Sequence, residues 1–222
     1  MLNRLGQAAA FLLLYAVALF VSAGTLRWDR AWIFLGLVVA ALTVTAFVLV
    51  RTNPEVIRAR HLPGRNTIGF DKIIISLYVP MFLALPVVAG LDAVRYHWSS
   101  LPFATVYPGA ALYLLAFLPS AWALSVNPFA ETSVRLQSER GQTVISAGPY
   151  RFVRHPMYVG IIVSSFAVPL ILGSAWAFVP GAAIDILIVV RTALEDRFLS
   201  RELPGYAEFA QRTRYRLVPG LW

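Results

Sequence analysis

The sequence has no cysteine and little charge. Only 14% of its 222 residues are charged, and a single lysine accompanies 18 arginines. The absence of cysteine excludes disulfides, thiolate nucleophiles and metal sites with Cys ligands. Histidine is also scarce, because the chain contains only His61, His97 and His155. These three histidines lie far apart along the chain, so we predict that the protein has no metal site.

Apolar residues, in contrast, are abundant. They make up 59% of the chain, and the mean hydropathy is +0.69. A soluble domain is typically about 45–50% apolar and about a quarter charged. The composition therefore excludes an ordinary soluble globular protein, a disordered chain and a collagen-like fibre. It indicates a membrane protein.

The apolar residues form blocks whose lengths suit membrane helices, since about 20 residues of helix cross about 30 Å of hydrocarbon. The last two blocks are short and separated by only a few residues around Ser174, which predicts a tight helical hairpin that need not cross the full bilayer. We therefore predict an all-α, polytopic transmembrane protein with five or six spans, six being preferred. The six segments are residues 7–24, 31–50, 72–91, 104–125, 157–173 and 176–190.

The basic residues fall mostly on one side of this arrangement. With the N-terminus in the cytoplasm, the inner segments hold 16 of the 19 basic residues, and the outer loops hold only Arg27, Arg30 and Arg95. By the positive-inside rule, both termini and the polar stretches 126–156 and 191–222 are cytoplasmic. We predict an integral protein of a bacterial inner membrane. The net charge of +8 is explained by this topology, so we predict no nucleic-acid partner.

The sequence pattern that indicates a functional site lies in residues 141–160. Pro156 stands at a favoured first position of a helix, and His155, which precedes a proline, is directed toward an extended conformation. Arg151, Arg154 and His155 therefore cluster at a helix N-terminus, where free N–H groups favour an anion. Basic residues before a membrane helix also occur simply through the positive-inside rule, so this pattern alone leaves both readings open.

Two sequence blocks resemble a known family. The run from Gly148-Pro149-Tyr150 through Arg154-His155-Pro156 to Tyr158 and Gly160 resembles the signature of the isoprenylcysteine carboxyl methyltransferases and their phospholipid methyltransferase relatives. The second block is Arg191-Thr-Ala-Leu-Glu195, followed by Tyr206 and the ending Leu-Val-Pro219. It departs from the family pattern at two places, because Asp196 stands where a second Glu is usual and Phe209 where a second Tyr is common. The resemblance extends over about residues 126–222.

This resemblance implies methyl transfer from S-adenosylmethionine at the cytoplasmic membrane surface. It divides the chain into a transmembrane scaffold, residues 1–125, and a methyltransferase core, residues 126–222, whose motif loop, hairpin and C-terminal helix enclose the cofactor pocket. In this interpretation Arg154 and His155 meet the cofactor carboxylate, and Glu195 binds a ribose hydroxyl or the amino group. The remaining residues of the expected cofactor site are Tyr150, Tyr158 and Gly160.

The residues expected to act on the methyl acceptor are Arg191 and Glu195, which share one helix face because they are four residues apart. If the acceptor is a carboxylate, Arg191 would orient it. If it is an amine or a thiol, a proton must leave and Glu195 would act as the base. Both groups could instead form an ordinary ion pair at a helix end.

The acceptor is expected to be lipophilic and to enter from the bilayer, so membrane lipids are the expected partners. The resemblance suggests a prenylated cysteine carboxylate, and a phospholipid amine or a small thiol is an alternative. The chain could also be a sterol-reductase-like enzyme that uses NADPH, or a non-catalytic membrane protein. Asp185, inside an apolar segment, is a further candidate site residue, and Asn127 and Glu131 could reach the site from the preceding loop. The sequence does not determine the oligomeric state.

Overall fold

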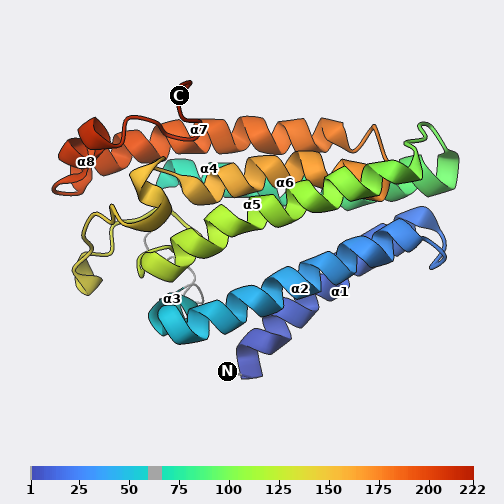
Figure 1. Ribbon diagram of the computed structural model, residues 1–222, viewed down its shortest axis with the longest axis horizontal. Coiled ribbons are helices and arrows are strands. Elements are labelled where there is room, and N and C mark those ends of the chain that lie inside the picture. The colour runs from blue at the N-terminus through green and yellow to red at the C-terminus, as the bar shows by residue number, and fades with distance from the viewer. Residues whose placement is uncertain (1, 60–66) are drawn as a thin grey trace. The chain divides into compact units, whose positions relative to one another are not determined.

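The structure is a computed structural model that describes the backbone of residues 2–59 and 67–222, and the side chains of residues 6–7, 9–57 and 67–222. Over these ranges it is helical and contains no strand, which confirms the predicted all-α fold. Two short helices, α3 (Pro54–Ala59) and α8 (Tyr206–Arg212), accompany six long ones (Figure 1). The long helices are α1 (Leu2–Ala23), α2 (Asp29–Thr52), α4 (Gly69–Gly90), α5 (Val106–Val126), α6 (Pro156–Leu172) and α7 (Phe178–Glu202). His61 and most of the polar segment before α4 lie outside the described residues.

Among the described residues, three helical segments are long and apolar enough to cross a membrane. They are Asp29–Thr52, Gly69–Tyr96, in which α4 continues through the π-helical turn Leu91–Tyr96, and Phe103–Val126. Ala9–Ala23 and Pro156–Leu172 are shorter apolar helices. Many large apolar side chains on these helices are exposed, Leu13 and Leu115 among them, as expected for surfaces that face lipid. The protein is an integral membrane protein, and the number of full spans stays a prediction of five or six.

The last two apolar segments form the predicted hairpin, but its second helix is longer than expected. The apolar segment was predicted to end at residue 190, and the helix that contains it continues to Glu202. The helix extends beyond the apolar run because residues 191–202 contain good helix formers and no Gly or Pro before Pro204. Arg191 and Glu195 therefore lie well inside α7 instead of at its end.

Residues that are distant in sequence gather into two compact units. The first comprises residues 1–41, 78–114 and 163–185, and the second comprises residues 42–77, 115–162 and 186–222. Every site residue expected from the two motif blocks lies in the second unit. The division of the chain into a scaffold and a methyltransferase core stays a prediction.

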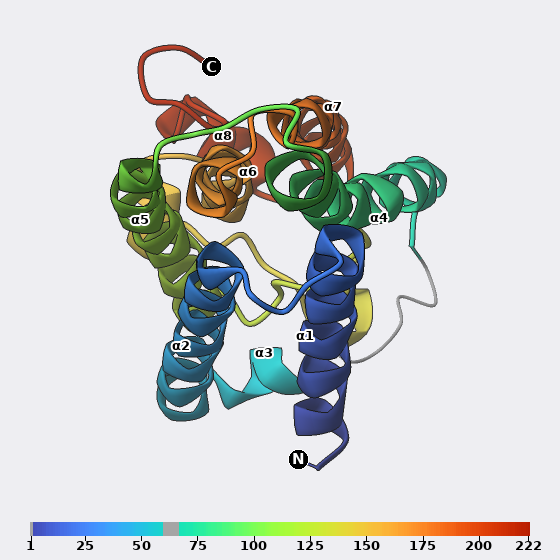
Figure 2. The same ribbon diagram turned by 90° about the vertical axis from the view of Figure 1, so that its right-hand side faces the viewer.

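In the first unit, α6 and α7 lie beside one another after the turn that joins them (Figure 2). The backbone of Gly181 approaches the carbonyl oxygen of Ser165 so closely that an added Cβ would lie 2.9 Å from it. The Ser165 hydroxyl donates a hydrogen bond of 2.6 Å to Asp185 Oδ1. Asp185, the acidic residue inside the apolar segment, is therefore hydrogen-bonded to the neighbouring helix.

A buried carboxylate also ties together the connections of the first unit. Asp92 is fully buried and accepts hydrogen bonds from the Ser99 amide at 2.6 Å, the Ser174 hydroxyl at 2.5 Å and the Trp176 amide at 3.1 Å. Because an unpaired buried carboxylate is costly, these donors fix the connection after α4 against the turn between α6 and α7.

In the second unit, α5 and α6 approach each other at Gly160. A Cβ on Gly160 would lie 2.6 Å from the Ala116 carbonyl oxygen and would also meet the Ser120 hydroxyl. The glycine at position 160 therefore allows the two helices to approach closely. Its expected role in cofactor binding stays a prediction.

We therefore expect Gly160→Ala to lower the free energy of unfolding by about 1–3 kcal/mol, the usual cost of overpacking a tight contact. Thermal unfolding of the purified protein in detergent measures this. Gly36→Ala in α2 is the control, because an added Cβ there meets nothing within 4 Å. Equal melting temperatures for the two variants would contradict the prediction.

Candidate functional site

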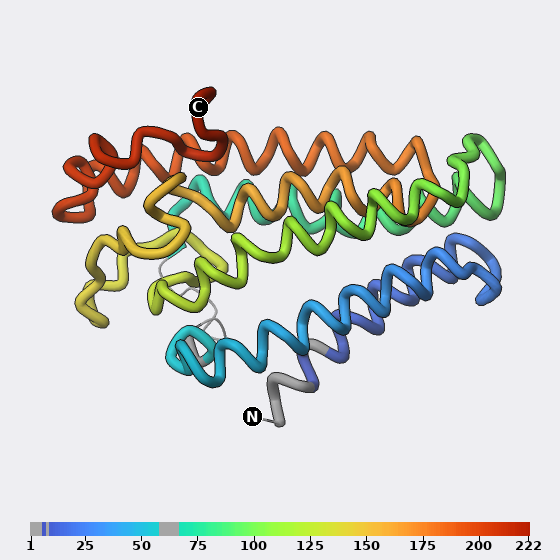
Figure 3. Tube along the Cα trace, in the orientation of Figure 1, coloured from blue at the N-terminus to red at the C-terminus, as the bar shows by residue number. Residues whose placement is uncertain are grey.

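The motif segment forms a tight turn that leads into α6. Gly148–Arg151 makes a short 3-10 helix, and α6 begins at Pro156 as predicted. The amides of Arg154 and His155 donate hydrogen bonds to the carbonyl oxygens of Tyr215 at 2.9 Å and Arg216 at 3.0 Å. These bonds hold the C-terminal segment, which runs back from α8 beside α7 (Figure 3), against the motif loop.

The carboxylate of Asp196 on α7 is the centre of this assembly. It accepts a pair of hydrogen bonds from Arg154, Nε to Oδ1 at 2.7 Å and Nη2 to Oδ2 at 3.0 Å. Arg216 Nε donates to Oδ2 at 2.9 Å, and the Tyr206 hydroxyl donates to Oδ1 at 2.9 Å. His155 Nε2 lies 3.4 Å from Oδ1. One side chain thus joins the motif loop, α7, α8 and the C-terminal segment.

These partners determine the ionisation of Asp196. Burial by itself would raise the pKa of Asp196, but the hydrogen bonds and charges of His155, Arg216 and Arg154 outweigh burial and lower that pKa well below its usual range. The carboxylate is therefore ionised at neutral pH. Burial and the adjacent negative charge raise the pKa of Tyr206, so its phenol stays protonated and donates to Asp196.

Arg154, expected to meet the cofactor carboxylate, has protein acceptors for all three of its nitrogens. Besides the two bonds to Asp196, Nη1 lies 3.0 Å from the carbonyl oxygens of both Thr213 and Arg214. Its side chain is buried. In this structure Arg154 therefore connects α7 to the C-terminal segment, and its contact with a cofactor stays a prediction.

A second group of residues lies next to this centre. The rings of His155 and Tyr158 are stacked, with centroids 5.5 Å apart and planes inclined by 2°. The Tyr158 hydroxyl donates a short hydrogen bond to Glu195 Oε2. Three residues that the sequence assigned to one site, His155, Tyr158 and Glu195, are thus brought together by α6 and α7.

Arg191 lies over the Tyr158 ring, with its guanidinium carbon 5.4 Å from the ring centroid. It does not pair with Glu195. Its partner is Asp71, in the first turn of α4, with 2.8 Å between Arg191 Nε and Asp71 Oδ1 and 3.2 Å between Nη2 and Oδ2. The alternative that Arg191 and Glu195 form an ordinary ion pair is therefore wrong, because a fully buried carboxylate from another helix binds the guanidinium.

The remaining candidates are placed beside the site. Tyr150 is buried in an apolar cluster with Leu203, Tyr206 and Phe209, and its hydroxyl accepts a hydrogen bond of 2.8 Å from Asn127. Asn127 thus reaches a site residue, as predicted. Glu131 pairs instead with Arg135 at 2.8 Å within the loop after α5.

Sequence reasoning missed Asp71, Asp196 and Arg216 as members of the site. Asp196 was noticed only as a departure from the family pattern, although an acid directly after Glu195 on a helix next to an apolar run was a usable signal. Asp71 gave a weaker signal, because an acidic residue in the first turn of a helix is common and is explained by the helix dipole alone. Its partner is 120 positions away and is visible only in the fold.

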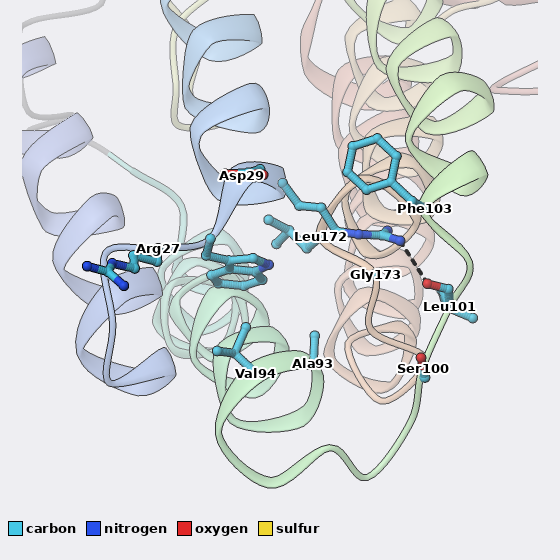
Figure 4. A pocket seen from close by; sticks show the side chains of 11 residues that line it. Arg27, Asp29, Ala93, Val94, Ser100, Leu101, Phe103, Leu172 and Gly173 are labelled. Carbon is cyan, nitrogen blue, oxygen red and sulfur yellow. Dashed lines mark hydrogen bonds between the residues drawn. The ribbon is translucent and has the colours of Figure 1, made fainter.

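A separate cavity of about 290 Å³ lies in the first unit, and it contains none of the expected site residues (Figure 4). Arg30 Nη2 donates to the Leu101 carbonyl oxygen at 2.7 Å, and Nη1 lies 3.2 Å from both the Thr105 hydroxyl and the Leu170 carbonyl oxygen. These contacts fasten three segments of the unit together, so we assign Arg30 a structural role. Among the described residues, no group of three His, Cys, Asp or Glu side chains could hold a metal ion.

The fold and this site together describe an all-helical membrane protein with a polar, aromatic site between the start of α6 and the middle of α7. Residues 104–204 match the family model described as phospholipid methyltransferase. This segment therefore matches that family over somewhat less than half of the chain, which confirms the resemblance seen in the two sequence blocks.

The chain is also similar to the cobalt-zinc-cadmium resistance protein CzcN of Cupriavidus metallidurans, with 36% identity over 87 residues. That match covers 35% of this chain and 37% of the relative. Because the match spans well under half of either protein, it shows that the two proteins share a similar segment. It does not indicate the substrate of this chain.

Asp196→Asn should destabilise the protein by about 3–5 kcal/mol at neutral pH, because it leaves Arg154 and Arg216 without their buried partner. The wild type should also lose stability in acid. The pKa of Asp196 is lower in the folded than in the unfolded chain, so its contribution is complete above about pH 4 and is lost as the pH falls toward the folded pKa.

Thermal unfolding in detergent from about pH 7 down to about pH 3 measures both effects. Glu202→Gln, an exposed acid on the same helix, is the control and should behave as the wild type. If Asp196→Asn showed the same loss of stability in acid as the wild type, Asp196 would not be the responsible group.

Proposed function

We propose that the protein transfers the methyl group of S-adenosylmethionine to a lipophilic acceptor at the membrane surface. The observation that carries this proposal is the assembly of His155, Tyr158 and Glu195 on α6 and α7, inside the segment that matches a methyltransferase family. Three of the residues expected in the site thus lie in contact with one another.

The side chains present suit this cofactor. Glu195 uses Oε2 to accept the Tyr158 hydrogen bond, and a carboxylate has further acceptor positions for a ribose hydroxyl or an amino group. The ring of His155, stacked on that of Tyr158, is an aromatic group of the kind that packs against adenine. When bound, the cofactor supplies an electrophilic methyl group on a positively charged sulfur, and the carboxylate of Glu195 favours a cation nearby.

The protein's own residues have two tasks in such a transfer. In-line displacement depends on alignment and on exclusion of water, and the buried network around Asp196 holds the motif loop and the C-terminal segment in fixed positions. Glu195 is the available base for an acceptor that must lose a proton.

The pairing of Arg191 favours an amine acceptor over a carboxylate. Asp71 already balances the charge of Arg191, and Glu195 adds a further negative charge. A carboxylate acceptor would find Arg191 already paired with Asp71, whereas an amine would find a base in Glu195. We therefore propose a phospholipid amine ahead of a prenylcysteine carboxylate or a small thiol. The charge asymmetry of the loops supports a cytoplasmic site and cytoplasmic termini in a bacterial inner membrane.

Calorimetric binding of S-adenosylhomocysteine to the detergent-solubilised protein tests the cofactor. We expect binding by the wild type and a loss of about tenfold or more in two variants, Glu195→Gln, which removes the carboxylate charge, and Tyr158→Phe, which removes the hydrogen bond to Glu195. Glu202→Gln and Tyr107→Phe, both at exposed positions, are matched controls. Binding of NADPH in place of S-adenosylhomocysteine would overturn the proposal.

The acceptor can be tested with labelled S-adenosylmethionine. Vesicles that contain phosphatidylethanolamine should take up label, while farnesylated cysteine peptides should take up much less. Transfer to the prenylated carboxylate at an equal or higher rate would show that the acceptor assignment is wrong, without affecting the assignment of the cofactor.

A further inference from the structure

Asp71 contributes to the site from outside the segment that matches the methyltransferase family. It lies in the first turn of α4, and the family match begins at residue 104. Its carboxylate is fully buried. Oδ1 lies 2.8 Å from Arg191 Nε, and Oδ2 lies 3.2 Å from Nη2. The N-terminal part of the chain thus supplies the counter-charge to a residue of the core.

The position of Asp71 is itself fixed by the loop after α5. Oδ2 accepts a hydrogen bond of 2.7 Å from the Val134 amide, and the Ile68 amide donates to the Val134 carbonyl oxygen at 3.2 Å. Arg191 Nη2 donates to the Thr132 carbonyl oxygen of the same loop at 2.9 Å. The start of α4, the loop and α7 therefore meet around one ion pair.

The contacts of Arg191 lead on to the proposed cofactor residues. Its guanidinium lies over the ring of Tyr158, whose hydroxyl donates to Glu195. If Arg191 lost its carboxylate partner, the nearest acid on its own helix would be Glu195, one turn away. Such a change would compete with the hydrogen bond between Tyr158 and Glu195.

We propose that Asp71 is a positioning residue for the methyltransferase site. It holds Arg191 over Tyr158 and keeps Arg191 away from Glu195, so that the Tyr158–Glu195 pair stays formed. Asp71 does not touch the reacting groups and acts through Arg191. This inference rests on the proposed function for its kinetic consequence, whereas the coupling of Asp71 to Arg191 can be tested without activity.

Asp71→Asn is the informative change, because an asparagine keeps an oxygen for the Val134 amide and removes only the charge that holds Arg191. We expect the affinity for S-adenosylhomocysteine and kcat to fall about tenfold, while KM for the acceptor changes less than about threefold. Asp29→Asn makes the same substitution in the first turn of α2, where the side chain is exposed, and should leave all three values unchanged.

The same substitution in an Arg191→Met background shows whether Asp71 acts through Arg191. A positioning role predicts that Asp71→Asn then lowers the affinity for S-adenosylhomocysteine by less than about twofold further. If Asp71 merely fastened the loop through Val134, its loss would be additive with that of Arg191. Additive losses, or a raised acceptor KM with unchanged S-adenosylhomocysteine affinity, would overturn the inference.

Thermal unfolding in detergent gives the readout that needs no activity. Arg191→Met leaves Asp71 buried and unpaired, so its melting temperature should fall, and the added Asp71→Asn should restore about half of the loss or more. Absence of this rescue would overturn the inference even in an active enzyme. Failure of the wild type to bind S-adenosylhomocysteine would instead refute the proposed function, and the rescue would still decide whether the two residues are coupled.

Discussion

The carboxylate of Asp196 is the constraint on which the second unit depends. It is buried, ionised and bonded to Arg154, Arg216 and Tyr206, which come from the motif loop, the C-terminal segment and α8. A buried charge of this kind is stable only while its donors stay in place. The motif loop, α8 and the C-terminal segment are therefore held in one arrangement against α7, and that arrangement shapes the candidate site.

The same rule applies to two further buried carboxylates. Asp92 collects hydroxyl and amide donors from the connections of the first unit, and Asp71 pairs with Arg191 in the second. Apolar packing between helices is not directional, whereas hydrogen bonds to a carboxylate are. In a chain with few charges, each buried acid thus fixes the register between segments that apolar contacts alone would leave free to shift.

Much of the site could be predicted from the sequence, because its residues form two local patterns. The turn before Pro156 and the four-residue spacing of Arg191 and Glu195 each depend on a single helix and its end. The expected convergence of His155, Tyr158 and Glu195 agrees with their contacts. The sequence was misleading for Arg154 and Arg191, because the local sequence around an arginine does not show whether its guanidinium is free or is paired with a distant carboxylate. Their partners, Asp196 and Asp71, lie 42 and 120 positions away.

The sequence by itself determined the membrane environment, the helical class and the resemblance to a methyltransferase family. The membrane environment and the helical class follow from composition and from the length of the apolar blocks, which depend on the hydrophobic effect and on the rise of a helix. The family resemblance follows from a short motif, which is recognised from neighbouring residues alone. Only the tertiary structure decided which charges are paired, how far α7 extends as a helix and which residues share a site. Those outcomes depend on contacts between distant segments, where the cost of burying a charge selects one partner among several possible ones.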